Sequence, residues 1–82
     1  MVEVYIDENW TFEEAVNNVE VLKKQVCFVD TFFSYFEAKE RIQFKRDLRK
    51  KIYALKFEQW KRERILETIY GDFEIEKLKK MI

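Results

Sequence analysis

The chain has 82 residues, which is enough for a single domain over residues 1–82 and too few for two. Its net charge is zero, 48% of its residues are apolar, and it contains one glycine, no proline and no histidine. Because histidine is the commonest general base and metal ligand, we expect no enzyme activity, no metal and no cofactor. The scarcity of glycine and proline argues against sheets and tight turns and favours long helices.

The first residues have the period of a strand. Residues 2–6 alternate apolar and polar side chains, with Val2, Val4 and Ile6 on one side. A lone strand needs a partner, which a second chain or residues 73–76 can supply. The alternative is an extended arm that packs on helices, and the pattern leaves both interpretations open.

A first helix is predicted over residues 11–33. Thr11 and Glu14 have the spacing of a capping box, in which each side chain bonds to the backbone amide of the other residue. Apolar residues then recur at alternating steps of four and three, which indicates a helix packed lengthwise on another helix. These residues are Ala15, Val19, Leu22, Val26, Val29, Phe33 and Phe36.

The end of this helix is apolar almost all round, so we expect residues 26–36 to be buried. A second side of this segment carries Phe28, Phe32 and Tyr35. Ser34 and Glu37 have the spacing of another capping box, which predicts a turn near residues 30–35. Because no glycine or proline forces a break there, one uninterrupted helix through the region is the alternative.

Residues 35–70 then form one long predicted helix, about 54 Å in length at the rise of an α-helix. Gly71 is the predicted stop, because glycine adopts the left-handed conformation that ends many helices. Asp72 is placed to cap a final helix over residues 72–82. A compact domain of this size has a radius of gyration of about 12 Å, so the molecule must be elongated, bent or oligomeric. We therefore predict an all-α fold, either an elongated helical hairpin or a small three-helix arrangement.

The long helix has apolar residues on two opposite sides. At 100° per residue, the predicted core side comprises Phe44, Leu48, Ile52, Leu55, Leu66 and Ile69. The opposite side carries Ile42, Tyr53, Phe57 and Trp60, with Arg46, Arg49 and Arg64 in the same arc. Tryptophan, tyrosine and arginine dominate binding hot spots, so this side predicts contacts with another protein or a second copy of the chain. The predicted contact residues are Tyr53, Phe57, Trp60, Arg49, Arg64 and Ile42. The alternative is a central helix whose second side packs on the arm or the C-terminal tail.

Charge is unevenly distributed along the chain. Residues 1–38 carry eight acidic residues and two lysines, a balance of −6, whereas residues 39–64 carry eleven basic and four acidic residues, a balance of +7. One interpretation is pairing between an acidic first helix and a basic second helix. The others are an acidic protein surface or nucleic acid, on which the aromatic residues would stack. The predicted nucleic-acid contacts are Lys45, Arg46, Lys50, Lys51, Lys56, Lys61 and Arg62.

The remaining signals concern location and role. A single cysteine, Cys27, excludes an internal disulfide and suits a reducing compartment. No apolar run reaches the length of a membrane span and no signal-peptide pattern opens the chain, so we expect a cytoplasmic protein without membrane contact. The function we expect is that of a small non-enzymatic protein-interaction module, such as an adaptor, assembly factor or inhibitor. The alternatives are a nucleic-acid-binding protein that uses the basic helix 39–64, and a structural homodimer or phage-type inhibitor of a host protein.

Overall fold

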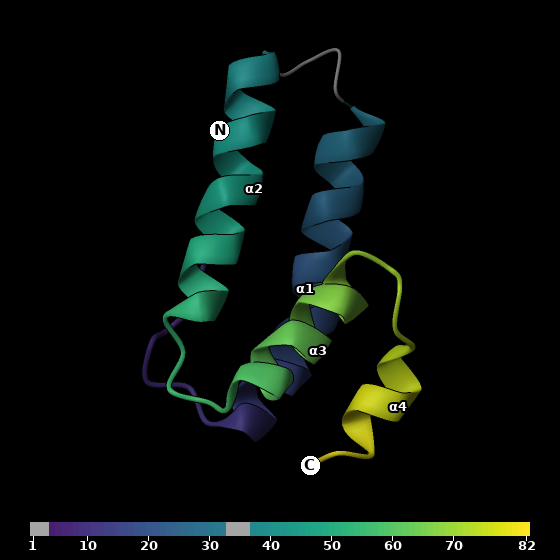
Figure 1. Cartoon of the computed structure of the whole chain (residues 1–82). Coiled ribbons are helices and arrows are strands. Elements are labelled where there is room, and N and C mark those ends of the chain that lie inside the picture. Colours follow the sequence, from purple (N-terminus) through teal and green to yellow (C-terminus); the bar gives the residue numbers. More distant parts are fainter. Residues whose placement is uncertain (1–3, 33–36) are drawn as a thin grey trace.

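The computed structural model describes residues 4–32 and 37–82, which form four helices and no strand. The helices are α1 (Phe12–Thr31), α2 (Ala38–Tyr53), α3 (Gln59–Ile69) and α4 (Ile75–Lys79). α1 and α2 run antiparallel, α3 folds back beside α1, and α4 lies beyond α3 on the side away from α2 (Figure 1). The radius of gyration is 12.6 Å and the principal extents are 37 × 23 × 16 Å. The predicted all-α fold is confirmed, and the molecule is bent.

α1 begins at the predicted capping box. The side chain of Thr11 accepts a hydrogen bond from the Glu14 amide at 3.2 Å, and the Glu14 carboxylate accepts one from the Thr11 amide at 3.2 Å. The predicted apolar seam is confirmed through Val29, and Val16 is buried beside it. The last two residues of that predicted seam, Phe33 and Phe36, lie outside the described residues.

The expectation that the end of this helix is buried is wrong for Phe28 and Phe32, whose side chains are 47% and 43% exposed. Their ring centroids lie 4.9 Å apart. The physical reason is helical position, because at 100° per residue both rings lie on a different side of α1 from its buried residues Leu22, Val26 and Val29. Tyr35 lies outside the described residues.

α1 and α2 are separate helices, so the alternative of one uninterrupted helix through this region is excluded. The backbone of Phe32 leaves the helical conformation, and α2 begins after Glu37. Of the predicted second capping box, Ser34 lies outside the described residues, and Glu37 makes no side-chain capping hydrogen bond.

The prediction of a single helix over residues 35–70 is wrong, because α2 ends at Tyr53 and α3 begins at Gln59. The apolar side of α2 reaches Leu55, which is buried. In a continuous helix the next core positions, four and seven residues on, would be Gln59 and Arg62. Both are polar, so extending α2 would bury two polar side chains in the core, and the chain turns there instead.

The bend places the rest of the core. It turns α3 back on α1, so that α3 contributes the buried side chains Ile65, Leu66 and Ile69. All six predicted core residues of the long segment are buried, which confirms that part of the periodicity. The helical spacing of apolar residues therefore identified buried positions correctly before and after the break, even though the helix is not continuous.

Gly71 ends α3 as predicted, with a φ of +89°. The amide of Asp72 donates to the carbonyl oxygen of Glu67 at 2.8 Å, and the amide of Gly71 donates to that of Thr68 at 3.1 Å. These two hydrogen bonds form a Schellman motif. The predicted cap at Asp72 is wrong, because its amide completes α3, and the last helix follows Glu74 and extends only from Ile75 to Lys79.

The first described residues form an extended arm that packs on the helices. Residues 4–7 contain no strand, Val4 is buried, and Ile6 packs against the core. The ammonium group of Lys51 donates a 2.7 Å hydrogen bond to the carbonyl oxygen of Val4, which ties the arm to α2. Val2 and Glu3, with which the predicted strand begins, lie outside the described residues.

Across residues 4–32 and 37–82, none of the helices combines the length and the apolar character that a membrane crossing requires.

Candidate functional site

The break between α2 and α3, residues 54–58, separates the predicted contact residues into groups. Ile42, Arg49 and Tyr53 lie on α2, and Arg46 lies between them at steps of four, three and four residues. This spacing places the four side chains on one face of the helix. The side chains of Ile42 and Tyr53 are 52% and 42% exposed, and both arginines are exposed. We call Ile42, Arg46, Arg49 and Tyr53 the α2 stripe.

Two shallow crevices lie along the α2 stripe, on the side that faces α3. The first has a volume of about 430 Å³ and is lined by Ile42, Lys45, Arg46, Arg49 and Tyr70. The second has a volume of about 300 Å³ and is lined by Arg49, Tyr53, Glu63, Leu66, Glu67, Tyr70 and Asp72. Arg49 and Tyr70 border both, and the guanidinium carbon of Arg49 lies 5.8 Å from the centroid of the Tyr70 ring. The crevices are therefore neighbours that share this cation–aromatic contact.

The two crevices differ in charge. Three cations and no acidic residue line the first crevice, as far as the described residues show. One of them, Lys45, pairs with Asp30 of α1 at 2.9 Å. Arg46 makes no ion pair with any other described residue. The second crevice carries three carboxylates on its α3 side and one cation on its α2 side.

Tyr70 was not among the predicted site residues. It follows α3 directly and is partly buried, and its hydroxyl oxygen is buried without a hydrogen-bond partner among the described residues. A continuous helix would place Tyr70 roughly a quarter turn away from the α2 stripe. Only the bend after α2 brings it alongside Arg49, so helical periodicity contained no signal for this residue.

Phe57 and Trp60 belong to a different group, at the start of α3. The Phe57 ring is partly buried and meets the Phe12 ring edge-on, with the centroids 5.7 Å apart. Trp60 is exposed, and its indole nitrogen donates a hydrogen bond to the Glu58 carboxylate. The ammonium group of Lys61 lies 5.0 Å from the centroid of Phe12 and 5.6 Å from that of Trp60. Phe57 thus packs the segment between α2 and α3 on the start of α1.

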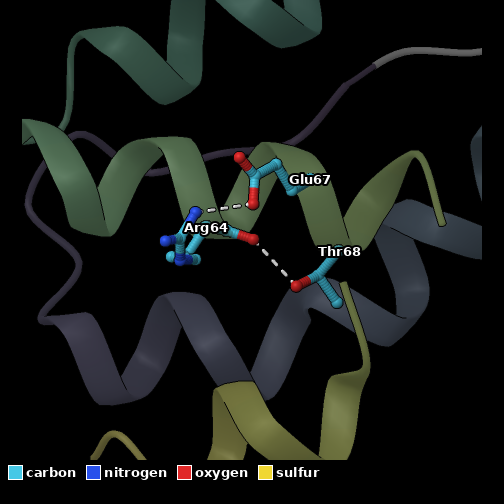
Figure 2. A network of polar contacts seen from close by, with 3 residues as sticks. All are labelled: Arg64, Glu67 and Thr68. Atoms are coloured by element: carbon cyan, nitrogen blue, oxygen red, sulfur yellow. Dashed lines mark hydrogen bonds and ion pairs between the residues drawn. The ribbon is translucent and has the colours of Figure 1, made fainter. Parts of the chain in front are cut away.

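Arg64, another predicted contact residue, makes its contacts within α3 and with the segment that follows it. It forms a 2.8 Å ion pair with Glu67, as Figure 2 shows, and its guanidinium carbon lies 5.3 Å from the centroid of the Phe73 ring. The buried hydroxyl of Thr68 donates to the Arg64 carbonyl oxygen at 2.8 Å in the same view. These contacts give Arg64 a structural role at the end of α3.

The predicted nucleic-acid contacts do not lie on one helix, because Lys61 and Arg62 belong to α3, Lys56 lies in the break, and the others belong to α2. Several of these cations also have internal partners. Lys45 pairs with Asp30, Lys51 bonds to the Val4 carbonyl, Lys61 lies over Phe12, and Arg62 bonds to the Leu55 carbonyl. The other three, Arg46, Lys50 and Lys56, are exposed.

The described residues contain no group of three or more histidine, cysteine, aspartate or glutamate side chains placed to hold a metal ion. No protein-family model matches the chain, and no curated protein and no solved structure matches it.

Proposed function

We propose that this chain is a non-enzymatic helical protein-interaction module, of the adaptor, assembly-factor or inhibitor kind, which docks the α2 stripe on a partner protein. The observation that carries the proposal is the composition and exposure of this face. Exposed Ile42 and Tyr53 stand at its two ends, with Arg46 and Arg49 between them. Tyrosine and arginine beside an exposed aliphatic residue are typical of the residues that dominate binding energy in protein interfaces.

The α2 stripe is available for binding because the fold uses the opposite face of the helix. Phe44, Leu48 and Ile52 fill the core from α2. Ile42 and Tyr53 are not among the apolar residues that pack against that core. Side chains that a fold does not need can be replaced at little cost in stability, so binding and folding can be tested separately.

A protein partner explains the face better than nucleic acid does. Four of the cations predicted to contact nucleic acid have internal partners, as described above. The second crevice beside the α2 stripe presents Glu63 and Asp72, whose charges repel a phosphate backbone. A protein segment of mixed charge meets no such penalty.

A cytoplasmic location is part of the proposal. Cys27 is exposed and free, and a thiol of this kind suits a reducing compartment.

The test is a quantitative capture experiment with tagged protein in a nuclease-treated lysate. The unmodified chain is compared with an Ile42→Ser/Tyr53→Ser variant, and with Val21→Ser as a matched control on the exposed side of α1. We expect a protein that is enriched by the unmodified chain and by the control and is lost with the double variant, while the circular dichroism of all three stays the same. Capture that does not depend on Ile42 and Tyr53 contradicts the proposal.

Light scattering on the same proteins decides whether the partner is a second copy of the chain. A dimer of the unmodified chain that becomes a monomer in the Ile42→Ser/Tyr53→Ser variant identifies the homodimer. A monomer in both, together with selective capture, identifies a different protein.

A further inference from the structure

We infer that the first crevice, lined by Ile42, Lys45, Arg46, Arg49 and Tyr70, is a carboxylate-binding pocket that receives an aspartate or glutamate side chain of the partner protein. The inference rests on the proposed function and specifies the chemistry of the partner: an acidic residue next to apolar residues.

The charges that line the pocket favour a bound anion. Arg46 and Arg49 stand three residues apart on α2, where neighbouring side chains of like charge repel each other. Lys45 pairs with Asp30 at 2.9 Å, whereas neither Arg46 nor Arg49 forms an ion pair with another described residue, although Arg49 also borders the carboxylates of the second crevice. An anion bound between the two arginines relieves their repulsion. Guanidinium groups are also the side chains best suited to hold a carboxylate through two parallel hydrogen bonds.

The hydroxyl group of Tyr70 also favours a bound acceptor. Tyr70 lines the pocket, and its buried hydroxyl oxygen has no hydrogen-bond partner among the described residues. Buried polar groups in native proteins are almost always satisfied, and an exception calls for an absent partner such as a ligand or a water molecule. A carboxylate held by Arg46 and Arg49 would supply this acceptor once binding shifts the side chains that cover the hydroxyl.

The surroundings of the pocket distinguish a protein carboxylate from a phosphate of nucleic acid. Ile42 forms one wall of the pocket, and Tyr53 lies beyond its other end on the α2 stripe. Apolar residues on both sides suit a peptide segment that places apolar side chains next to its acidic one. If a phosphate of a nucleic-acid strand occupied the pocket, the next phosphate along the α2 stripe would lie near Glu63 and Asp72 in the second crevice. Their carboxylates would repel that phosphate.

The experiment is an NMR titration of the isotope-labelled full chain that follows the side-chain Nε–H signals of its arginines. The probes are a capped helical peptide of leucine, alanine and glutamate, the same peptide with glutamine in place of glutamate, inorganic phosphate, and a single-stranded oligothymidylate. We expect the glutamate peptide to shift the signals of Arg46 and Arg49 and to bind at least about tenfold more tightly than the glutamine peptide, since hydrogen bonds to charged groups are the stronger ones.

Three variants locate the binding. Tyr70→Phe and Arg49→Gln are expected to weaken binding of the glutamate peptide about tenfold, whereas Lys50→Gln, which removes an equal charge from an exposed position outside the pocket, leaves it unchanged. Because the hydroxyl of Tyr70 has no partner, Tyr70→Phe should leave the melting temperature unchanged or raise it. This separates a loss of binding from a loss of folding.

Equal binding of the two peptides overturns the inference, and so does an equal effect of Lys50→Gln and Arg49→Gln. Phosphate or oligothymidylate binding that depends on Arg49 while neither peptide binds also overturns it, and identifies the pocket as a phosphate site. These results can rule out carboxylate binding while capture of a protein from the lysate still depends on Ile42 and Tyr53. In that case only the carboxylate assignment is lost and the proposed function stands.

Discussion

The guanidinium group of Arg62 lies 2.8 Å from the carbonyl oxygen of Leu55 and donates a hydrogen bond to it across the break between α2 and α3. A second bond, at 2.9 Å, joins the same guanidinium group to the side chain of Gln59. The break contains neither glycine nor proline, so the chain turns here through its side chains. The Leu55 carbonyl oxygen thus accepts two hydrogen bonds just beyond the end of α2, one from Arg62 and one from the Phe57 amide at 2.9 Å.

We therefore expect Arg62→Met to lower the free energy of unfolding by about 1–3 kcal/mol, because it removes the charged one of the two donors to the Leu55 carbonyl oxygen while it preserves most of the alkyl chain. Urea denaturation followed by circular dichroism measures the change. Lys56→Met, at an exposed position within the same break, is the control and should have little effect. Equal midpoints for Arg62→Met and the unmodified chain would show that the bond does not stabilise the break.

Gly71→Ala should lower the free energy of unfolding by about 1–2 kcal/mol, because the φ of +89° at this position is unfavourable for a residue with a Cβ atom. No atom lies within 4 Å of the position that the Cβ would occupy, so the cost is one of backbone conformation and not of crowding. Thermal or urea denaturation checks the effect. Gly71→Asn should cost less than Gly71→Ala, since asparagine tolerates this conformation better, and the reverse order would refute the explanation.

Lys51→Met should release the N-terminal arm from α2, because it removes the 2.7 Å hydrogen bond to the Val4 carbonyl oxygen. Hydrogen exchange and limited proteolysis of residues 4–10 should become faster, while α1 and α3 keep their protection. Lys50→Met is the matched control at the neighbouring exposed position and should leave the arm protected. An equal effect of the two substitutions would mean that loss of positive charge, rather than this bond, loosens the arm.

Local chemistry explains which parts of the fold could be predicted from the sequence. The capping box of Thr11 and Glu14 and the stop at Gly71 depend on residues within one turn, so the pattern identified both ends correctly. The break after Tyr53 depends on the polar residues Gln59 and Arg62 at core positions. The predicted core side passed directly from Leu55 to Leu66, so these two polar positions did not count against a continuous helix.

The candidate site divides in the same way. Ile42, Arg46, Arg49 and Tyr53 could be grouped because they belong to one uninterrupted helix. Phe57 and Trp60 were grouped with them only on the assumption of a continuous helix, and the structure places them in a separate cluster with Lys61 at the start of α3. Tyr70 reaches the site through the tertiary bend, which no local pattern encodes.

The measurement that most directly tests docking through the α2 stripe is site-specific photocrosslinking in cells. A photoreactive phenylalanine analogue is placed at Tyr53 in one version of the chain and at exposed Val21 in another. Docking through the α2 stripe predicts a discrete protein adduct from position 53, absent from position 21 and abolished by the additional substitution Ile42→Ser. Identical adducts from both positions, or none from position 53 while position 21 crosslinks, would contradict it.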